Sequence, residues 1–457
     1  MAQQVTQQLP GASKKFRLIL REGGIAREMG GEDSTVGVSI VDRVFTEALD
    51  QSASDIHLQP ERAQTRIRLR LDGVMHQLGS FQNEYAPNVL ARIKLAAGMH
   101  IDERREAQDG RIDMEYMTRR FSARVSVLPS LNGEKVVMRL LDPASVRIDI
   151  GVLGMPPDVQ KLWLQAIQTP YGMIIVTGPT GSGKTSTLYA SINKLDRQQR
   201  NIVTVEDPVE YEFQDNITQV QVTEKMTFPR VMRSFLRQDP DVMMVGEMRD
   251  PESLSIGIQA SLTGHLVMTT LHTNNAVETL GRMIDMGGEP YLIASTVICI
   301  LAQRLVRTIC PECKEQYKPN DDEILAMGMS LAEGASKSFF HGKGCKNCRE
   351  TGYKGRVGVF ELLMNTHNIK ELITRGAPMS DLFAAAKAQS MRTMMQDGLE
   401  KILRGITTPT EVIHAVYTAA SVESPEARAM AEAVTAQAEE QAAENPAPES
   451  AVSPSLT

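Results

Sequence analysis

The order of apolar and polar residues divides the chain into two regions with different periodicities. Residues 37–145 contain short segments that alternate apolar and polar side chains, such as TRIRLRLDG and FSARVSVLP, with DG and NG pairs between them. A two-residue period predicts half-buried strands, and these pairs predict the turns that join them. Apolar positions three and four residues apart predict helices from about Ser39 to Leu49 and from about Pro87 to Met99. This region is therefore predicted to form an α/β domain.

Residues 157–419 follow a second pattern, in which continuous apolar runs alternate with helical segments. The runs are GMIIVTG, NIVTVED, DVMMVGE and HLVMTTLH. Strands of this kind are buried on both faces, as in a parallel sheet that helices cover. Residues 146–156 carry Pro and Gly and are predicted to link the two domains. The apolar stretch Tyr291–Leu305 is too interrupted to span a membrane and is predicted to form a buried helix.

Both ends of the chain are polar. Residues 1–36 are predicted to be a flexible lead-in and lack the apolar core of a signal peptide, so the protein is expected in the cytoplasm. Residues 421–457 carry a net charge of −6 out of a total of −7, and a helix starting near Ser424 would be marginal. We therefore treat residues 420–457 as an acidic tail. The nearly neutral remainder lacks a basic stripe, so no direct contact with nucleic acid is expected.

A glycine-rich segment joins the first buried strand of the second region to a helix. The segment GPTGSGKT fits the pattern GxxxxGK[ST]. Its residues, with the serine that follows, are Gly178, Pro179, Thr180, Gly181, Ser182, Gly183, Lys184, Thr185 and Ser186. Glycines let amide groups converge on a phosphate, Lys184 brings positive charge to the β- and γ-phosphates, and the Thr185 hydroxyl is placed to ligate Mg²⁺. ATP and Mg²⁺ are therefore the predicted ligands. The alternative is a glycine-rich turn that fits the pattern by chance. The apolar strand before the segment and the helix after it favour the phosphate-binding motif over that alternative.

Polar residues at the ends of the other buried strands are candidates for catalysis. Glu247 ends the run DVMMVGE and is our first choice for orienting and deprotonating water. Glu206 and Glu210 are a second source of carboxylates. His265 and His272 flank the run HLVMTTLH, where a donor could sense the γ-phosphate, although either histidine taken alone is as readily a core or surface residue.

Four cysteines form two CxxC pairs. They are Cys310, Cys313, Cys345 and Cys348. Two such pairs bring four thiolates to one ion, which predicts a closed and therefore structural Zn²⁺ site within an element at about 308–358. The segment DDEILAMGMSLAEGA between the pairs is predicted to contain a small helix, and free buried thiols or redox use are the alternatives. Cys299 lies in the apolar stretch and is expected in the core.

Several segments occur in the order typical of one ATPase family. VTGPTGSGKTSTLYA, VEDPVEY, LRQDPDVMMVGEMRD and SLTGHLVMTTLHTN, together with SASDIHLQP and ARIKLAAGMHIDERR, closely resemble the secretion ATPase superfamily, in particular the motors of type II secretion and type IV pilus assembly. The likeness covers about residues 37–415. It implies an α/β fold with a PAS-like N-terminal domain followed by a RecA-like P-loop ATPase domain with a tetracysteine zinc insertion. It also implies a homohexamer.

The resemblance assigns roles to individual residues. It places Glu206 and Glu210 in an acidic box, Glu247 at the end of the Walker B strand, and His265 and His272 in a histidine box. It implies that Arg124 and Arg139, with Arg111 a weaker third, swing onto the γ-phosphate when the N-terminal domain closes. The alternative for each arginine is an exposed strand residue. This chain has Ala107, Ser122 and Gln259 where the family often has other residues, but none of these departures removes a catalytic group.

The expected function is that of a Mg²⁺-dependent ATPase motor. By resemblance, its partners are an inner-membrane platform protein and other machinery components, at the cytoplasmic face of the inner membrane. The extra N-terminal module by which many family members dock to an inner-membrane partner is not found in this sequence, so the family's usual mode of recruitment is not expected here. The cysteine element is typical of secretion and assembly motors and disfavours a retraction or DNA-uptake motor. A zinc-ribbon nucleic-acid-binding P-loop protein is a further alternative, which the aromatic content of 5% disfavours.

Overall fold

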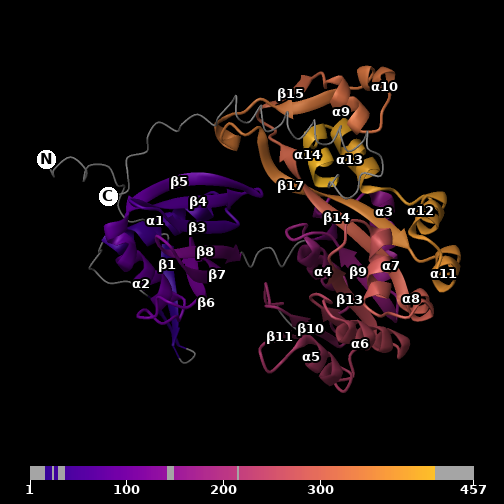
Figure 1. Cartoon of the computed structure of the whole chain (residues 1–457), viewed down its shortest axis with the longest axis horizontal. Coiled ribbons are helices and arrows are strands. Elements are labelled where there is room, and N and C mark those ends of the chain that lie inside the picture. Colours follow the sequence, from indigo (N-terminus) through magenta and orange to yellow (C-terminus); the bar gives the residue numbers. More distant parts are fainter. Residues whose placement is uncertain (1–15, 23–24, 29–35, 142–148, 214–215, 417–457) are drawn as a thin grey trace. The chain divides into compact units, whose positions relative to one another are not determined.

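The computed structural model describes residues 16–22, 25–28, 36–141, 149–213 and 216–416 (Figure 1). Contacts divide the chain into two units between Pro143 and Ala144, and each unit has its own core. Most of the predicted lead-in, residues 146–148 of the predicted linker and the acidic tail 420–457 lie outside the described residues. The expected mixed α/β fold is confirmed in both units.

The first unit is an antiparallel sheet covered on one face by two helices. Its elements are β1 (Phe16–Glu22), β2 (Ile25–Glu28), α1 (Val36–Asp50), β3 (Asp55–Pro60), β4 (Gln64–Leu71), β5 (Val74–Gln82), α2 (Ala86–Ala96), β6 (Gln108–Tyr116), β7 (Arg119–Ser130) and β8 (Gly133–Leu141). The eight strands lie in the order β2-β1-β6-β7-β8-β3-β4-β5. Strand β4 illustrates the alternation, since every second residue from Thr65 to Leu71 is buried.

Strands β1 and β2 lie within the predicted lead-in. Residues 16–22 read FRLILRE, a short segment with three consecutive apolar residues between charged ones, and β1 pairs with both β2 and β6. Leu18 is buried in the core of the unit. The neighbouring glycines suggested a flexible segment, but the short apolar run between them extends the sheet at its edge.

The second unit is built on a mostly parallel sheet. Its sheet and the helices that pack on it comprise α3 (Pro157–Ile167), β9 (Gly172–Thr177), α4 (Lys184–Ile192), β10 (Ile202–Glu206), β11 (Ile217–Gln221), α5 (Phe228–Phe235), β12 (Val242–Val245), α6 (Pro251–Leu262), β13 (Leu266–Leu271), α7 (Ala276–Asp285), α8 (Pro290–Thr296), β14 (Val297–Ile309) and β17 (Tyr353–Met364). The seven strands lie in the order β11-β10-β12-β13-β9-β14-β17, and only β17 is antiparallel to its neighbour.

Helices cover both faces of this sheet, as the continuous apolar runs predict. Met173 and Ile175 of β9 belong to the core that includes α5, α6, α7 and α8. Ile174 and Val176 belong to the core on the opposite face, with α3 and α4. All residues of β9, β12 and β13 are buried, so these strands form the centre of the unit.

The predicted buried helix over Tyr291–Leu305 is wrong. Helix α8 ends at Thr296, and the chain continues as β14, which pairs with β9 on one side and β17 on the other. Both faces of β14 are covered, so its apolar residues are continuous and show no two-residue period that would separate strand from helix. Cys299 lies in the core, as expected. Among the helices of the described residues, none has the length and apolar character needed to cross a bilayer.

The remaining elements follow β14 and β17. The segment between those two strands contains β15 (Lys314–Tyr317), α9 (Asp321–Ala326), α10 (Leu331–Ala335), β16 (Phe339–Gly342) and a 3-10 turn at Lys346–Cys348; after β17 come α11 (His367–Thr374), α12 (Met379–Ala388), α13 (Met394–Leu403) and α14 (Pro409–Val416). Two short helices therefore stand where the sequence predicted one. β15 and β16 form a small antiparallel sheet of their own.

We expect the replacement Phe45→Ala to destabilise the first unit selectively. The Phe45 ring is fully buried there, and its removal should cost about 3–5 kcal/mol. Hydrogen exchange of strands β3 to β8 reports this loss, whereas fluorescence of the single tryptophan, Trp163, reports the second unit. Val74→Ala, at a residue 40% exposed, is the control and should change stability by less than about 0.5 kcal/mol. An equal loss in the Trp163 transition would contradict separate cores.

Candidate active site

The glycine-rich loop connects the end of β9 at Thr177 to the start of α4 at Lys184. Gly178, Gly181 and Gly183 have φ angles of +149°, +80° and +86°, which side-chain-bearing residues rarely adopt. The loop therefore turns tightly from a buried strand into a helix. Its geometry gathers backbone N–H groups at the amino end of α4, an arrangement suited to an anion.

Lys184 lies folded against this loop. Its Nζ donates to the carbonyl oxygens of Gly178 and Pro179 at 2.8 and 3.0 Å. Burial lowers the pKa of Lys184 to about 8, against the opposing effect of the Glu247 charge, and the Arg304 charge lowers it further. The amine therefore holds its proton less firmly than an ordinary lysine, and a nearby anion would strengthen its hold on that proton.

The loop offers further groups that suit a phosphate and its metal ion. The Ser182 hydroxyl is buried and has no hydrogen-bond partner among the described residues. Pro179, Thr180 and Thr185 are exposed, and Ser186 is half-buried. A Cβ atom placed on Gly181 would meet nothing within 4 Å, so the loop is open on that side. Amides, hydroxyls and one amine form the donor set that a phosphate ester and Mg²⁺ would need.

Glu247 and His272 lie next to this loop. Glu247 follows β12, is 13% exposed, pairs with Arg249 and lies 3.5 Å from Nε2 of His272 through Oε2. Burial and then the Lys184 charge lower the pKa of His272, so its neutral form is favoured. A cleft of about 660 Å³ lies beside the loop, between Pro179–Thr180 and the segment His272–Asn274. The structure thus brings Lys184, Glu247 and His272 close to one another, and His272 also lines the cleft.

Glu206 lies at the same edge of the sheet but is fully engaged. It ends β10 and is buried, and it accepts hydrogen bonds from the Tyr189 hydroxyl at 2.5 Å, the Thr204 hydroxyl at 2.7 Å and Nε2 of Gln219 at 3.2 Å. Burial raises the pKa of Glu206, and the charge of half-buried Glu210 adds to the rise. The carboxylate of Glu206 therefore ties α4, β10 and β11 together.

His265 is not brought to the site. It precedes β13, and the first residue of β13, Leu266, pairs with Gly172 at the start of β9, whereas the loop follows the end of β9. Its Nδ1 lies 2.9 Å from the Ala260 carbonyl oxygen. His265 and His272 thus flank opposite ends of strand β13, and only His272 is near the loop.

The three arginines of the first unit form a row across its sheet. Arg111, Arg124 and Arg139 pair in register on β6, β7 and β8, on the face opposite α1 and α2. The row continues to Asp55 on β3, whose Oδ1 accepts from Nε of Arg139 at 3.0 Å. Ser122, one of the departures from the family pattern, accepts from Arg111 at 3.2 Å. Arg111 and Arg139 remain about half exposed, at 47% and 55%.

Gln303 is a site residue that sequence reasoning missed. It lies in β14 beneath the loop, is buried, and its amide donates to the Ser182 carbonyl oxygen at 2.6 Å. The same amide accepts from the Thr187 hydroxyl at 2.8 Å. The available signal was a glutamine directly before Arg304 in a mostly apolar segment.

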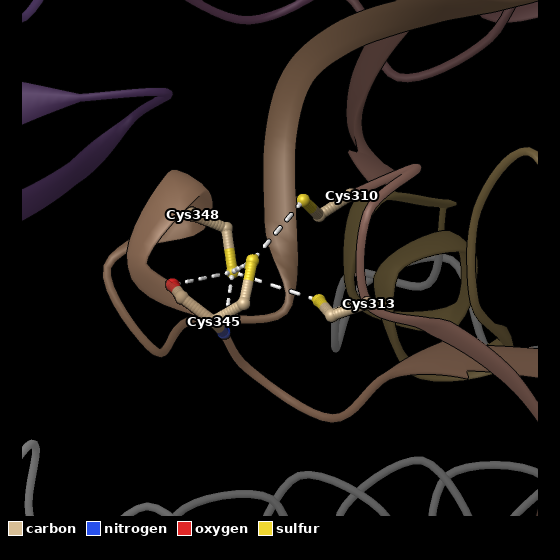
Figure 2. A group of neighbouring side chains, drawn as sticks. All are labelled: Cys310, Cys313, Cys345 and Cys348. Carbon is tan, nitrogen blue, oxygen red and sulfur yellow. Dashed lines mark hydrogen bonds between the residues drawn. The ribbon is translucent and has the colours of Figure 1, made fainter.

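The four cysteines form one compact cluster (Figure 2). Their sulfurs all lie within 4.8 Å of one another, with Cys310–Cys345 at 3.8 Å and Cys313–Cys348 and Cys345–Cys348 at 3.7 Å. A tetrahedral ion with Zn–S bonds of about 2.3 Å would place its sulfurs about 3.8 Å apart. The backbone N–H groups of Cys345 and Gly352 donate to the Cys348 sulfur, and they bring its pKa down to about 7 although burial raises it. The cluster therefore fits Zn²⁺.

Comparisons with known proteins agree with this geometry. The family model described as type II/IV secretion system protein matches residues 31–414. The type II secretion system protein E of Dickeya dadantii is 45% identical over 388 residues, which cover 84% of this chain and 76% of that protein. The type IV pilus assembly ATPase PilB of Thermus thermophilus is 41% identical over 83% of this chain and 43% of that protein.

A solved structure extends the likeness to the fold. The crystal structure of the pilus retraction motor PilT with bound ADP superposes with a TM-score of 0.59 at 27% identity, covering 84% of this chain and 97% of that one.

We expect the loop to bind sulfate more weakly as pH rises. Sulfate keeps its charge over this range, whereas Lys184, with a pKa of about 8 in the free protein, is protonated below that pH and neutral above it. From about pH 7 to about pH 9 the affinity should fall roughly tenfold, as measured by calorimetry. Lys184→Arg keeps the charge and should remove this dependence. A wild-type affinity that stays constant over the range would contradict the assignment.

Proposed function

Because the chain belongs to the type II/IV secretion system protein family, we propose that it is a hexameric motor that hydrolyses ATP to power type II secretion or type IV pilus assembly. It is an ATPase of the secretion and pilus-assembly group. The single observation that carries the proposal is the group of Lys184, Glu247 and His272 at the end of the central strands, with an open cleft beside His272 and the loop. Neither a structural module nor a simple binding protein needs this combination of cation, carboxylate and open cleft.

In this proposal the loop from Gly178 to Ser186 holds the nucleotide. Its backbone N–H groups and Lys184 bind the β- and γ-phosphates, and Lys184 exchanges the carbonyl oxygens that it contacts for phosphate oxygens. The Thr185 hydroxyl is the ligand from the loop to Mg²⁺, which when bound neutralises phosphate charge.

The carboxylates divide the remaining work. Glu247 orients and deprotonates the attacking water, because its carboxylate lies beside Lys184 and His272. Glu206 and Glu210 are the second choice, since the three hydrogen bonds that Glu206 accepts fit a residue that shapes the site from behind. His272, favoured in its neutral form, offers a donor to the γ-phosphate.

Arg124 and Arg139, with Arg111 weaker, supply charge from the first unit when it closes over the nucleotide. Their row on one sheet face supports a joint role, since one movement of the unit would deliver all of them. Cations that arrive only on closure stabilise the charge of the transition state and couple hydrolysis to motion.

The four cysteines hold a structural Zn²⁺. A set of four thiolates leaves no ligand position open for substrate, so the ion would supply stability to the element rather than chemistry. Because such an element is typical of secretion and assembly motors, we favour extension over retraction.

The motor would act at the cytoplasmic face of the inner membrane on a platform protein. The relatives named above are components of secretion and pilus machines, which supports such partners. A nucleic-acid-binding role remains the alternative, and a steep salt dependence of tight DNA binding would favour it.

Glu247→Gln tests the motor proposal most directly. The variant keeps the shape of the side chain and should bind ATP about as tightly as the wild type, while kcat falls at least about a hundredfold because the base is lost. Lys184→Ala is the companion variant and should lose nucleotide binding itself. Binding is measured with a fluorescent ADP and turnover by phosphate release. Turnover close to wild type in the glutamine variant would remove Glu247 from the mechanism.

Metal analysis tests the cysteine cluster independently of activity. We expect one zinc per chain and its loss in Cys313→Ser, with lower thermal stability of the element because folding and binding are coupled there. Cys299→Ala is the matched control, since Cys299 is also buried and lies in β14, the strand that leads to the cluster, but is not part of it. Full zinc content in Cys313→Ser, or none in the wild type, would contradict the proposed site.

A further inference from the structure

A buried glutamine supports the glycine-rich loop from below. Gln303 is 1% exposed in β14, the strand next to β9, where the other buried side chains are almost all apolar. Burying an amide is unfavourable unless both of its ends find partners, and Gln303 has them in Ser182 and Thr187. Both partners belong to the segment that makes the phosphate site.

The chemistry of the partners fixes the orientation of this amide. The Ser182 carbonyl oxygen can only accept, so it must face the Nε2 group of Gln303. The Thr187 hydroxyl donates to Oε1 at the other end. One orientation therefore satisfies both contacts, and the side chain bridges the last turn of the loop to the first turn of α4.

The bond to Ser182 also orients the next N–H group. In a trans peptide the C=O and N–H bonds point in opposite directions. Because the Ser182 carbonyl points at Gln303, the N–H of Gly183 points away from β14. Gly183 is the residue before α4, where backbone N–H groups receive an anion.

Contacts to Gln303 also explain two of the three loop glycines. A Cβ atom on Gly178 would lie 2.5 Å from the Gln303 carbonyl oxygen, and one on Gly183 would lie 3.2 Å from Nε2. Gly181 has no such neighbour within 4 Å. The loop therefore rests on Gln303 at both of its ends and is open in the middle.

We propose that Gln303 is a positioning residue of the phosphate site, which holds the Ser182–Gly183 peptide so that the Gly183 N–H faces the β-phosphate of the nucleotide. It contacts the loop and not the substrate, so it acts through the geometry of the loop. The inference rests on the proposed binding of a nucleotide at this loop, and its test separates the two.

Gln303→Met keeps the volume of the side chain and removes both hydrogen bonds. Because the Ser182 carbonyl is then no longer held, the direction of the Gly183 N–H is no longer fixed. We therefore expect ADP and pyrophosphate to bind about tenfold more weakly. Affinity is measured well below the melting temperature by displacement of a fluorescent ADP, with zinc content and Trp163 fluorescence as checks of folding. The value of kcat/KM for ATP should fall by at least the same factor.

Ser191→Ala is the matched control. Ser191 is a buried hydroxyl on α4 that accepts from Trp163 and donates to the Thr187 carbonyl, without touching the loop. Its loss should lower stability and leave nucleotide affinity unchanged. If Gln303→Met behaves in the same way, the residue is only structural and the inference is wrong. If the wild type itself binds no ADP, the proposed function fails instead.

Gln303→Glu gives a second, pH-dependent readout. An ionised carboxylate cannot donate to the Ser182 carbonyl, whereas a protonated one can. Relative to the wild type at each pH, the affinity of this variant for ADP should therefore be lowest at alkaline pH and recover as pH falls. Equal affinity of variant and wild type across the range would overturn the positioning role, even if the methionine variant failed to fold.

Discussion

Parallel strands end at one edge of a sheet, and this constraint assembles the candidate site. The order β10, β12, β13, β9 and β14 delivers Glu206, Glu247, His272, the glycine-rich loop and Gln303 side by side, although 121 residues of chain separate Ser182 of the loop from Gln303. Each strand is buried on both faces. Glu206 is the last residue of β10, and Gln303 lies in β14 just past its last pairing with β9. The apolar runs that form the sheet thus also decide where its chemistry lies.

The same burial sets the electrostatics of the site. Lys184 is partly removed from water between a like charge, Arg304, and an opposite one, Glu247, and its pKa falls because desolvation outweighs the carboxylate. Arg304 is itself buried and donates to the Asn274 carbonyl oxygen, which fixes the segment that follows His272. Neighbouring residues of β14 therefore support both walls of the cleft, Gln303 under the loop and Arg304 under the histidine segment. A phosphate bound at the loop would compensate the excess positive charge of Lys184 and Arg304 over Glu247.

Local patterns in the sequence predicted the loop and the cysteine cluster, because glycine and cysteine spacing carries the information directly. His265 was a candidate together with His272 because two histidines flank one strand, and the sequence does not show which end of that strand lies near the loop. The direction of the parallel strand, which brings only its carboxyl end to the loop, separates them. Gln303 was missed because its partners, Thr187 and Ser182, precede it by 116 and 121 residues. The prediction of a helix over β14 was wrong for a related reason. Burial of β14 on both faces removes the two-residue alternation by which a strand is recognised in a sequence.

Strand β14 also connects the two chemical centres of the second unit. It runs from Gln303 under the loop to Ile309, and Cys310 follows and donates its N–H to the carbonyl oxygen of Gly352 next to β17. β17 pairs with β14 along most of its length, so an ion bound by four sulfurs would tie both strands together at one end. Interiors are close-packed and shift little without cost, so order at that end limits the movement of β14 beneath the loop. The proposed zinc site would thus stabilise the strand on which the phosphate loop rests while taking no part in the reaction.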